Sequence, residues 1–370
     1  MDARPAPLLA ELEQLITSGG SITFARYMEM ALYHPDHGYY ASRVPGHGTT
    51  YATSASLSPW FGRFVARELE RMWQALGRPD PFTVIEFGAG LGGLAAAAIP
   101  DAGPLLDVLR WRIVEQFDSV AHLQRQTLGE AAQYVEWIGS LDGPAVTGCV
   151  LANEVLDNFP VHRFQVAGGE ILEVYVGFRD GRLVEELLPC SEEEMVAPVR
   201  KVLDELKEGD RFEICPGIGP WCRDVARAVE RGYLFTIDYG DEEPDIFKRG
   251  PHGTLATYGG TRSGTDALES PGLLDITFDV DFTAVAREAE AAGFDTELLA
   301  LQRYWLHSLG IANEIAEIDD GTQLAKAWGW AEDLKGLARE RAELLKLVEK
   351  KGLGGCLVYR ASKGFEPPGQ

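Results

Sequence analysis

Residues 82–94, which read Phe-Thr-Val-Ile-Glu-Phe-Gly-Ala-Gly-Leu-Gly-Gly-Leu, constrain this chain more than any other segment. A β-prone run ends at three glycines, Gly88, Gly90 and Gly92, and a run of small residues with helical propensity follows. The order strand, tight turn, helix lets a backbone without Cβ atoms approach a nucleotide-like ligand closely. Glu86 lies inside the segment, and the chain has no phosphate-binding Gly-x-x-x-x-Gly-Lys-Ser/Thr sequence. We therefore expect a nucleotide-like cofactor without phosphates.

Composition and charge narrow the class of protein further. The chain has 370 residues, of which 45% are hydrophobic and 25% are charged, which is ordinary for a globular protein with a large core. Length alone suggests two or three domains. The formal charge of -23 disfavours nucleic acids and anionic membranes as partners. It makes a basic protein partner plausible, although an acidic surface that only keeps the protein soluble explains the charge equally simply.

The cysteines and the amino terminus indicate a reducing, cytoplasmic setting. The five cysteines are odd in number and form no Cys-x-x-Cys pair, which argues against a disulfide scaffold or a zinc ribbon. Residues 1–15 carry early acidic residues and do not read as a signal peptide. No apolar run approaches the ~20 residues needed to span a bilayer. His34, His37 and His47 lack the spacing of a metal site, so we expect no metal.

From residue 82 onward, strand-like and helix-like segments alternate. This pattern predicts an α/β fold with a mostly parallel, doubly wound, Rossmann-like sheet. Two late segments, 294–301 and 355–361, are predicted to form an antiparallel hairpin at the sheet edge. The predicted strands of the parallel sheet are 82–87, 111–115, 134–138, 146–152 and 233–238.

The chain divides into a core and added segments. We predict an N-terminal helical region with an active-site loop at 1–80, and an inserted α+β substrate or interaction segment at 161–214. An Asp-Gly turn at 180–181 predicts a hairpin inside that insertion. A Gly-rich stretch at 250–273 reads as a second insertion. The remaining segments, 81–160 and 215–370, are predicted to form the cofactor-binding core.

An acidic residue ends the second predicted strand. This residue is Glu115, and Gln116 follows it directly. In nucleoside-binding α/β sheets, a carboxylate at this position accepts hydrogen bonds from both ribose hydroxyls. The glycine spacing also leaves NAD open as the cofactor, because Gly93 completes a Gly-x-Gly-x-x-Gly sequence from Gly88. The simpler alternative is a turn that only packs a strand against a helix.

Polar side chains follow two more predicted strands. Asn153, Glu154 and Asp157 come directly after the strand that ends at Ala152. Polar groups beyond the carboxyl ends of parallel strands stand in the ligand crevice, where a carboxylate can orient a cationic amine or guanidinium, or take its proton. Capping of the next turn is the structural alternative.

A further strand, 233–238, ends in the same way. It is followed by Tyr239 and has Asp238 as its last residue. The chain has no Gly-x-Ser-x-Gly sequence, which disfavours a serine hydrolase.

Taken together, these segments resemble the MidA-like family of S-adenosylmethionine-dependent methyltransferases, to which a mitochondrial complex I assembly factor that dimethylates an arginine belongs. The similarity is collinear over roughly residues 20–310. The matching sequences are Ile22-Thr-Phe-Ala-Arg-Tyr-Met28, Leu32-Tyr-His-Pro-Asp-His-Gly-Tyr-Tyr40, Ser58-Pro-Trp-Phe-Gly62, Glu86 to Leu94, Ala152-Asn-Glu-Val-Leu-Asp-Asn-Phe-Pro-Val161, Ile237-Asp-Tyr-Gly240, Gly253-Thr-Leu255 and Asp275-Ile-Thr-Phe-Asp-Val-Asp-Phe282.

The resemblance implies a class I methyltransferase core that binds S-adenosyl-L-methionine. By this resemblance, the three glycines line the methionine and ribose parts of the cofactor, Glu115 holds the ribose hydroxyls, and Asn153 and Glu154 face the sulfonium and the acceptor. The full predicted cofactor set is Glu86, Gly88, Gly90, Gly92, Glu115, Gln116, Asn153 and Glu154. The predicted catalytic set is Glu154, Asp157, Asp238 and Tyr239.

The chain departs from the family pattern where the acceptor is expected to bind. Gly48-Thr-Thr-Tyr51 replaces the usual Gly-Asp-Phe, and Ser54-Ala-Ser56 replaces Ala-Pro-Glu. Ala256-Thr-Tyr258 stands where an Arg usually follows Gly-Thr-Leu. We therefore predict methyl transfer to a nitrogen or oxygen acceptor, with a protein or peptide side chain, arginine by resemblance, ahead of a small molecule.

Two other functions remain open at this point. An NAD-linked oxidoreductase would bind nicotinamide, although the usual catalytic Tyr-x-x-x-Lys or His partner is not found near the glycine motif. A non-catalytic assembly factor would keep its biological role after the predicted catalytic residues are replaced. A homodimer is possible.

Overall fold

A computed structural model describes residues 7–42, 58–259, 262–328 and 330–366. The chain forms two compact units, each built from three segments. The first comprises 1–51, 155–223 and 239–288, and the second comprises 52–154, 224–238 and 289–370. The N-terminal helices and the predicted insertion at 161–214 thus belong to one unit. The finer division predicted from the sequence, including the boundaries of the 250–273 insertion, stays a prediction.

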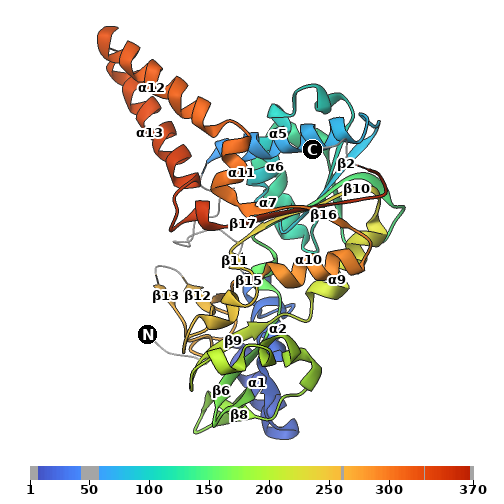
Figure 1. The fold of residues 1–370 in the computed structure, drawn as a ribbon, viewed down its shortest axis with the longest axis vertical. Coiled ribbons are helices and arrows are strands. Elements are labelled where there is room, and N and C mark those ends of the chain that lie inside the picture. The colour runs from blue at the N-terminus through green and yellow to red at the C-terminus, as the bar shows by residue number, and fades with distance from the viewer. Residues whose placement is uncertain (1–6, 43–57, 260–261, 329, 367–370) are drawn as a thin grey trace. The chain divides into compact units, whose positions relative to one another are not determined.

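The second unit is built on a seven-stranded sheet of order β16-β17-β10-β5-β2-β3-β4 (Figure 1). The five strands from β10 to β4 run parallel, and β17 pairs antiparallel with both β10 and β16. This is the predicted Rossmann-like α/β sheet, and the prediction is confirmed. The strands are β2 (Phe82–Phe87), β3 (Leu109–Val114), β4 (Val135–Ile138), β5 (Val146–Asn153), β10 (Val229–Asp238), β16 (Asp295–Leu301) and β17 (Leu357–Lys363).

The two late strands pair as predicted, but they do not form a hairpin. Three helices lie between them in the chain, α11 (Gln302–Ser308), α12 (Ile311–Trp328) and α13 (Ala331–Leu347). A backbone hydrogen bond joins the end of β16 to the start of β17, because the Gln302 N–H donates to the Cys356 carbonyl at 2.7 Å. The predicted hairpin was wrong because antiparallel pairing does not reveal how much chain connects the strands.

Helices α12 and α13 pack on one another as an antiparallel pair that extends from the second unit (Figure 1). The residues that the pair buries include Ile318, Ala325 and Leu344. Trp328 and Trp330 remain 70% and 54% exposed, and their rings stack at 6.3 Å.

Close packing of α5 (Pro59–Ala75) against α6 (Gly93–Ala98) explains two sequence features. A Cβ atom at Gly62 would lie 2.4 Å from the Cβ atom of Ala97, so only glycine fits in this part of α5. The small residues of α6, which follow the glycine turn, also allow the two helices to pack closely. Ser58 caps α5 by accepting a hydrogen bond from the Trp60 N–H. The apolar face of α5 is buried, namely Phe61, Phe64, Val65, Leu69, Met72 and Trp73. Helix α7 (Asp118–Leu128) belongs to the same unit.

The first unit begins with α1 (Pro7–Gly19) and α2 (Phe24–Tyr33). They are separated at Ser18-Gly-Gly-Ser21, and the Thr23 hydroxyl caps α2 by accepting from the Arg26 N–H at 3.2 Å. The short helix α3 (Tyr39–Ser42) follows. Residues 43–57, with the departures at 48–51 and 54–56, lie outside the described residues.

An antiparallel sheet of order β1-β7-β6-β9, with β8 paired to the free side of β7, supports these helices. The predicted hairpin is confirmed, because Asp180 and Gly181 form its turn with φ of 52° and 76°, as a type I′ turn requires. The strands are β1 (Ile22–Thr23), β6 (His162–Ala167), β7 (Glu170–Arg179), β8 (Arg182–Leu188) and β9 (Arg211–Ile214).

Small elements complete this unit. They are α8 (Ala197–Arg200), β11 (Gly240–Asp241), β12 (Ala256–Gly259), β13 (Arg262–Gly264), β14 (Asp275–Thr277) and β15 (Val280–Asp281). Helices α9 (Ile218–Ala228) and α10 (Phe282–Ala291) run across the sequence boundaries of the units.

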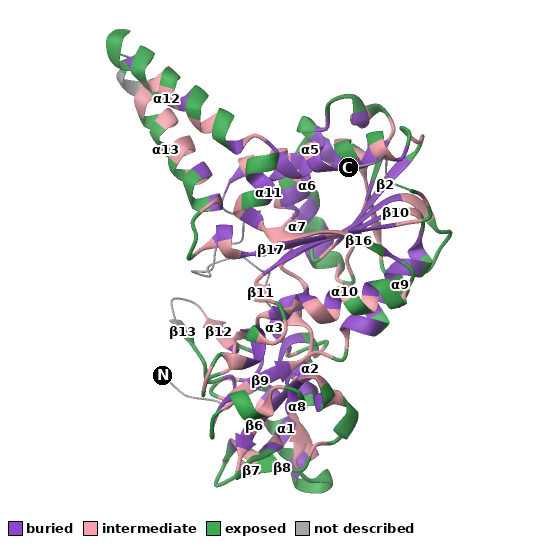
Figure 2. Cartoon of the chain, viewed as in Figure 1, coloured by how far each residue is buried: buried purple, intermediate pink, exposed green. Residues whose placement is uncertain are grey.

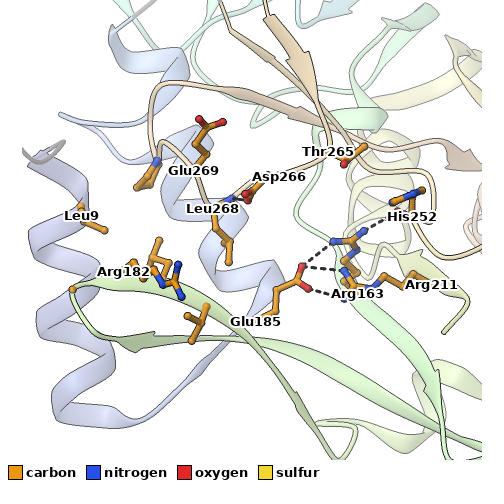
Figure 3. A pocket seen from close by; sticks show the side chains of 14 residues that line it. Leu9, Arg163, Arg182, Glu185, Arg211, His252, Thr265, Asp266, Leu268 and Glu269 are labelled. Atoms are coloured by element: carbon orange, nitrogen blue, oxygen red, sulfur yellow. Dashed lines mark hydrogen bonds and ion pairs between the residues drawn. The ribbon is translucent and has the colours of Figure 1, made fainter. Parts of the chain in front are cut away.

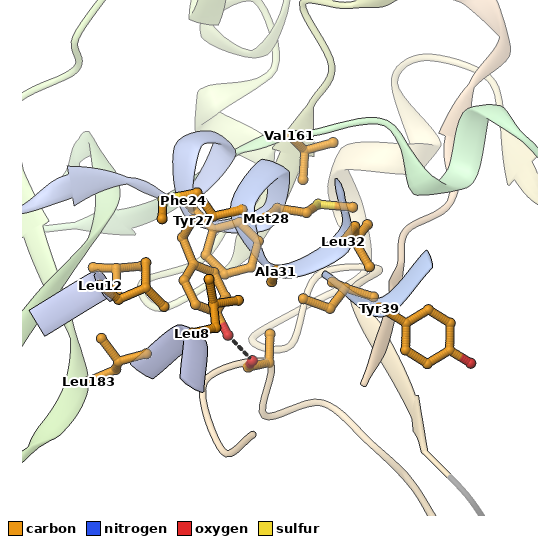
Figure 4. Packing of buried hydrophobic residues seen from close by; sticks show 14 of the residues in the cluster. Leu8, Leu12, Phe24, Tyr27, Met28, Ala31, Leu32, Tyr39, Val161 and Leu183 are labelled. Atoms are coloured by element: carbon orange, nitrogen blue, oxygen red, sulfur yellow. Dashed lines mark hydrogen bonds between the residues drawn. The ribbon is translucent and has the colours of Figure 1, made fainter. Parts of the chain in front are cut away.

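The first unit has its own hydrophobic core, shown in Figure 4. Leu8 and Leu12 of α1 meet Tyr27 and Met28 of α2, and all four side chains are at most 1% exposed. Figure 2 shows that the central strands β2, β10 and β17 are mostly buried, whereas the helices have exposed faces. Burial of one large apolar side chain contributes about 1.5–3 kcal/mol. Each unit can thus hold its own functional side chains in place.

Candidate functional site

The carboxyl ends of four adjacent parallel strands meet at one edge of the sheet in the second unit. Asp238 ends β10, Asn153 ends β5, Gly88 follows β2 and Glu115 follows β3. The strands are in register, because Asn153 pairs with Ile237 on β10 and the neighbouring strands pair up to their last residues. The structure therefore brings together predicted site residues from four separate segments. This edge is where open α/β sheets bind their ligands.

The glycine turn at this edge has left-handed backbone at each of its three glycines. The φ angles are 60° at Gly88, 52° at Gly90 and 83° at Gly92. A residue with a Cβ atom adopts such angles only with strain. A Cβ atom at Gly90 would meet nothing within 4 Å, so the space above that residue is open. The turn offers bare backbone to a ligand.

Glu115 is held firmly beside this turn. Its Oε1 accepts the Phe117 N–H at 3.0 Å, and its Oε2 accepts from Gln124 Nε2 at 3.0 Å. The same Nε2 donates to the Gly90 carbonyl at 3.0 Å. A carboxylate has about four lone-pair positions, so each oxygen can still accept a hydrogen bond from a ribose hydroxyl. The sequence analysis missed Gln124, because a glutamine inside a helix belongs to no motif.

Two predicted cofactor residues have other surroundings. Glu86 is 2% exposed and accepts the Trp111 indole N–H at 2.8 Å. Burial raises the pKa of the Glu86 carboxyl to about 7, and the hydrogen bond from Trp111 opposes that rise. Glu86 thus lies within the sheet, below the turn, whereas Gln116 is exposed. A direct role for either residue in cofactor binding stays a prediction.

Asn153 and Glu154 show two signs of a binding site. Asn153 is 9% exposed, and within the described ranges its Oδ1 has no hydrogen-bond partner, while its Nδ2 donates to Glu154 Oε1 at 3.4 Å. A buried acceptor of this kind calls for a donor from a ligand. Glu154 has a φ of 53°, and its N–H donates to the Ile237 carbonyl at 2.8 Å. Strained backbone at a strand end is a feature of functional sites.

These observations fit S-adenosyl-L-methionine at this edge. The open glycine turn would take the body of the cofactor, Glu115 its ribose hydroxyls and Asn153 one of its donors. Asp238, the remaining predicted residue of this unit, is fully buried at the end of β10.

Asp157 and Tyr239 lie in the first unit. Asp157 is 3% exposed, in a short 3-10 helix at 156–158, and its carbonyl accepts the Phe278 N–H at 3.0 Å. The Tyr239 carbonyl accepts the Val280 N–H at 2.8 Å. The Asp-Ile-Thr segment of the family pattern therefore fixes the backbone beside both predicted residues.

A tyrosine–aspartate cluster, defined here as Tyr33, Tyr40, Asn158 and Asp275, lies in the same unit. Asp275 Oδ1 accepts from the Tyr40 hydroxyl at 3.0 Å and from Asn158 Nδ2 at 3.1 Å. The Tyr33 hydroxyl donates to the Asn158 carbonyl at 3.0 Å, and the two tyrosine rings are 5.5 Å apart. Tyr33 is 41% exposed, so the cluster reaches the surface of the unit. All four residues lie in segments that match the family pattern, but nothing in the sequence indicates that these side chains meet.

Charge is concentrated at this cluster. Burial raises the pKa of Asp275 to about 6, against the opposing hydrogen bonds from Tyr40, the Ile276 backbone and Asn158. Tyr258 on β12 pairs in register with Asp275 on β14. Its pKa is raised by burial and then by the nearby carboxylates, first that of Asp157.

The Gly-Thr-Leu sequence of the family pattern has a structural role here. Glu213 accepts both the backbone N–H of Thr254 at 2.9 Å and its hydroxyl at 2.8 Å. Gly253 has a φ of 63°, and a Cβ atom there would lie 2.6 Å from the Glu213 carboxylate. The Thr254 hydroxyl also accepts the Asp279 N–H at 3.1 Å. This motif therefore holds a loop against β9.

A cavity of about 560 Å³ lies elsewhere in the first unit (Figure 3). No predicted site residue lines it. Part of its charged wall is paired internally, because Glu185 binds Arg163 at 3.0 Å and Arg211 at 2.7 Å. Arg163 also donates to the His252 carbonyl at 2.7 Å. These groups satisfy one another, so the cavity does not replace the sheet edge as the candidate site.

Two negative findings apply only to the residues that the structure describes. No group of three or more His, Cys, Asp or Glu side chains among them has the geometry to hold a metal ion. No helix among them combines the length and apolar character needed to cross a membrane.

Comparison with known proteins decides the family. A family model described as an S-adenosyl-L-methionine-dependent methyltransferase matches residues 64–299. This chain belongs to the MidA-like methyltransferases. The crystal structure of a Burkholderia thailandensis protein described as a methyl transferase, bound to S-adenosyl-homocysteine, is 30% identical to this methyltransferase with a TM-score of 0.86. The similarity covers 97% of this chain and 92% of that one.

Two animal proteins are also similar to this methyltransferase. The Drosophila melanogaster mitochondrial protein arginine methyltransferase NDUFAF7 homolog is 30% identical over 330 residues, which cover 77% of this chain and 70% of the relative. Rattus norvegicus mitochondrial protein arginine methyltransferase NDUFAF7 is 26% identical over 347 residues, with coverage of 82% and 74%.

These findings confirm the predicted family, fold, methyltransferase activity and cofactor, and the NAD and non-catalytic hypotheses lose their basis. The acceptor, the homodimer and the cytoplasmic location stay predictions, and both animal relatives are named as mitochondrial.

Proposed function

We propose that this methyltransferase transfers the methyl group of S-adenosyl-L-methionine to a nitrogen of a protein side chain, with arginine as the first candidate. The animal relatives, which are named protein arginine methyltransferases, support this acceptor at 26% and 30% identity. The formal charge of -23 also favours a basic partner.

The observation that carries the proposal is the tyrosine–aspartate cluster. Within the described part of the chain, Asp275 accepts hydrogen bonds from neutral groups only. A carboxylate without a cationic partner favours the binding of a cation, and aromatic rings beside it strengthen that preference. A guanidinium or ammonium side chain meets both conditions, whereas a neutral or anionic acceptor meets neither.

The reaction is an in-line displacement. The bound cofactor supplies a methyl group on a positively charged sulfur. The lone pair of the acceptor nitrogen forms the new N–C bond, the C–S bond breaks, and its electron pair stays on sulfur to give S-adenosyl-homocysteine. The nitrogen then loses a proton. Such a step needs alignment and a proton acceptor rather than a covalent enzyme intermediate.

We assign the acceptor contacts first to Glu154 and Asp157, and then to Asp238 and Tyr239. A carboxylate can hold a guanidinium in one orientation and accept its proton during transfer. The strained backbone of Glu154 and the burial of Asp157 support a role that requires fixed carboxylates. Asn153 and Glu115 are assigned to the cofactor.

The test combines binding with transfer. Calorimetry would measure the affinity of the purified protein for S-adenosyl-L-methionine, S-adenosyl-homocysteine and NAD, with Glu115→Ala as the binding variant. Methyl-labelled cofactor would then be offered to matched peptides that contain one arginine, lysine, citrulline or glutamate. We expect label on the arginine peptide and none on citrulline.

Transfer to citrulline or glutamate alone would overturn a cationic acceptor without affecting the cofactor result. The alternative acceptor is a small metabolite, which the sequence departures at 48–51 and 256–258 leave open. That alternative predicts label on free arginine or another small amine and none on any peptide.

A further inference from the structure

Gln124 is a fully buried polar side chain in the middle of α7, outside every motif that the sequence offers. Its Nε2 donates to the Gly90 carbonyl and to Glu115 Oε2, each at 3.0 Å. Its Oε1 accepts the Trp137 indole N–H at 2.8 Å. One amide therefore joins the glycine turn, the carboxylate after β3 and a side chain on β4.

The amide has only one orientation that satisfies these partners. Nε2 faces two oxygen acceptors, and Oε1 faces an indole donor, so a flipped amide would lose all three hydrogen bonds. The Trp137 ring that donates to Oε1 is itself packed, because the Arg125 guanidinium lies 4.1 Å from its centre. A Cβ atom at Gly92 would already lie 3.5 Å from Gln124. The glycine turn is thus packed directly on this side chain.

The network restricts both predicted ribose contacts. A carboxylate rotates about its last bond unless both oxygens are held, and Glu115 is held by the Phe117 N–H on one oxygen and by Gln124 on the other. The Gly90 carbonyl receives its hydrogen bond from the same amide group. Loss of the amide would free the carboxylate and leave the carbonyl and the indole without their partner.

We propose that Gln124 is a positioning residue that fixes the Glu115 carboxylate and the Gly90 backbone for the ribose of the cofactor. The proposal rests on the predicted contact between Glu115 and the ribose hydroxyls, whereas binding of the cofactor itself follows from the family. Gln124 acts through its neighbours and does not need to touch the cofactor.

Three variants separate this role from ordinary packing. Gln124→Met keeps the side-chain volume but removes the donor and acceptor, and Gln124→Glu places a carboxylate against Glu115 and the Gly90 carbonyl. Gln126→Met is the matched control, since Gln126 is exposed on the same helix and its side chain forms a hydrogen bond with His122 of that helix. By calorimetry, Gln124→Met should bind S-adenosyl-homocysteine about tenfold more weakly, Gln124→Glu more weakly still, and the control as the wild type does.

A ligand without ribose hydroxyls tests the mechanism. The 2′,3′-dideoxy analogue of S-adenosyl-homocysteine should bind the wild type weakly, and Gln124→Met should weaken it no further. The double variant Glu115→Ala/Gln124→Met should bind S-adenosyl-homocysteine no more weakly than Glu115→Ala, because both changes remove one coupled interaction. Thermal unfolding would verify that the variants are folded at the temperature of measurement.

Two outcomes would overturn the proposal. Equal losses for both ligands, with additive effects in the double variant, would assign Gln124 to packing alone. Full affinity in Glu115→Ala would remove the ribose contact on which the positioning role depends. Neither result would change the finding that the wild type is an S-adenosyl-L-methionine-dependent methyltransferase, and neither bears on the acceptor.

Discussion

The sheet edge of the second unit and the tyrosine–aspartate cluster of the first unit are assembled in different ways. At the sheet edge, each side chain directly follows or ends a strand, and parallel pairing in register aligns them. In the cluster, Tyr40, Asn158 and Asp275 come from three distant segments and meet through side-chain hydrogen bonds. Short motifs can therefore specify the sheet edge, whereas the tyrosine–aspartate cluster depends on contacts between remote parts of the chain.

The two regions also differ in the chemical groups that they present to a ligand. The sheet edge has bare glycine backbone, carboxylates and the Asn153 amide oxygen, which has no partner among the described residues. This combination suits a ligand with several hydroxyl and amine donors. The cluster combines aromatic rings with a partly buried carboxyl, which suits a single cationic group. Changes in one unit should consequently separate cofactor binding from methyl transfer.

The largest expected effect is the loss of transfer in Asp157→Asn. This change removes a charge from the first unit and keeps the side-chain shape, so methyl transfer to the arginine peptide should fall by about 100-fold or more. The affinity for S-adenosyl-homocysteine, measured by calorimetry, should stay within about twofold. Asp204→Asn, an exposed position of the same unit, serves as the control. Unchanged transfer would remove Asp157 from the catalytic set.

The next effect concerns the stability of the first unit. Arg163 is 4% exposed and binds Glu185 and Glu213, each at 3.0 Å. Arg163→Met leaves the buried Glu213 carboxylate without this cation, whereas Glu185 keeps its ion pair with Arg211. A loss of about 3–5 kcal/mol in the free energy of unfolding is expected. Arg179→Met removes an ion pair whose arginine is 68% exposed, and it should cost less than about 1 kcal/mol.

The measurement for Arg163→Met is urea unfolding followed by fluorescence. The cofactor site should be unaffected at low urea, where calorimetry should return the wild-type affinity for S-adenosyl-homocysteine. A large loss of affinity in the folded variant would show that the two regions are less independent than their construction suggests.

A smaller effect is expected from Gly90→Ala. The Cβ atom has room, so the cost to folding is the left-handed backbone alone, about 1–2 kcal/mol. The affinity for S-adenosyl-homocysteine should fall about tenfold in addition, because the new methyl group occupies the open face of the turn. Gly77→Ala has the same open space and a φ of 79°, and should lose stability without affinity. Equal affinity in both variants would contradict the ligand-binding role of the turn.

The smallest expected effect concerns Glu86→Gln, in which the free energy of unfolding should depend less steeply on pH. The folded carboxyl has a pKa of about 7, above its ordinary value of 4.5. As pH rises from 4.5 to 7, the unfolded chain ionises first, so stability falls across this window and stays low above it. Glutamine can still accept the Trp111 N–H but does not ionise.

Thermal unfolding between pH 5 and pH 8 would compare the two proteins. The wild type should lose stability with rising pH more steeply than Glu86→Gln, and the variant should be the more stable at pH 8. Parallel profiles would mean that Glu86 ionises normally in the folded state. Asp275, with a pKa of about 6, should give the same sign over a lower range in Asp275→Asn.

Most of the second unit was predictable because its signals are local. The five parallel strands, the turn glycines and the residues at the strand ends lie where periodicity and glycine spacing put them. One structural prediction was wrong, and the reason is that strand pairing is not a local property. The pairing of 294–301 with 355–361 was expected as a hairpin, although α11, α12 and α13 intervene, because pairing partners can be any distance apart in the chain.

Gln124 shows the same limit within the candidate site. A buried glutamine in a helix reads like any surface glutamine until its partners are known, and those partners lie on a turn and two strand ends. Asp275 likewise reads as one acidic residue among 57.

The sequence by itself determined the family, the Rossmann-like core, the cofactor and the residues at the ends of its strands. It could do so because backbone conformation and strand periodicity are local properties of short segments. Only the tertiary structure decided which polar side chains act together. Gln124 with Glu115, and Tyr40 with Asp275, become partners when long-range packing brings distant segments together and restricts the access of water, so that these groups form hydrogen bonds with one another.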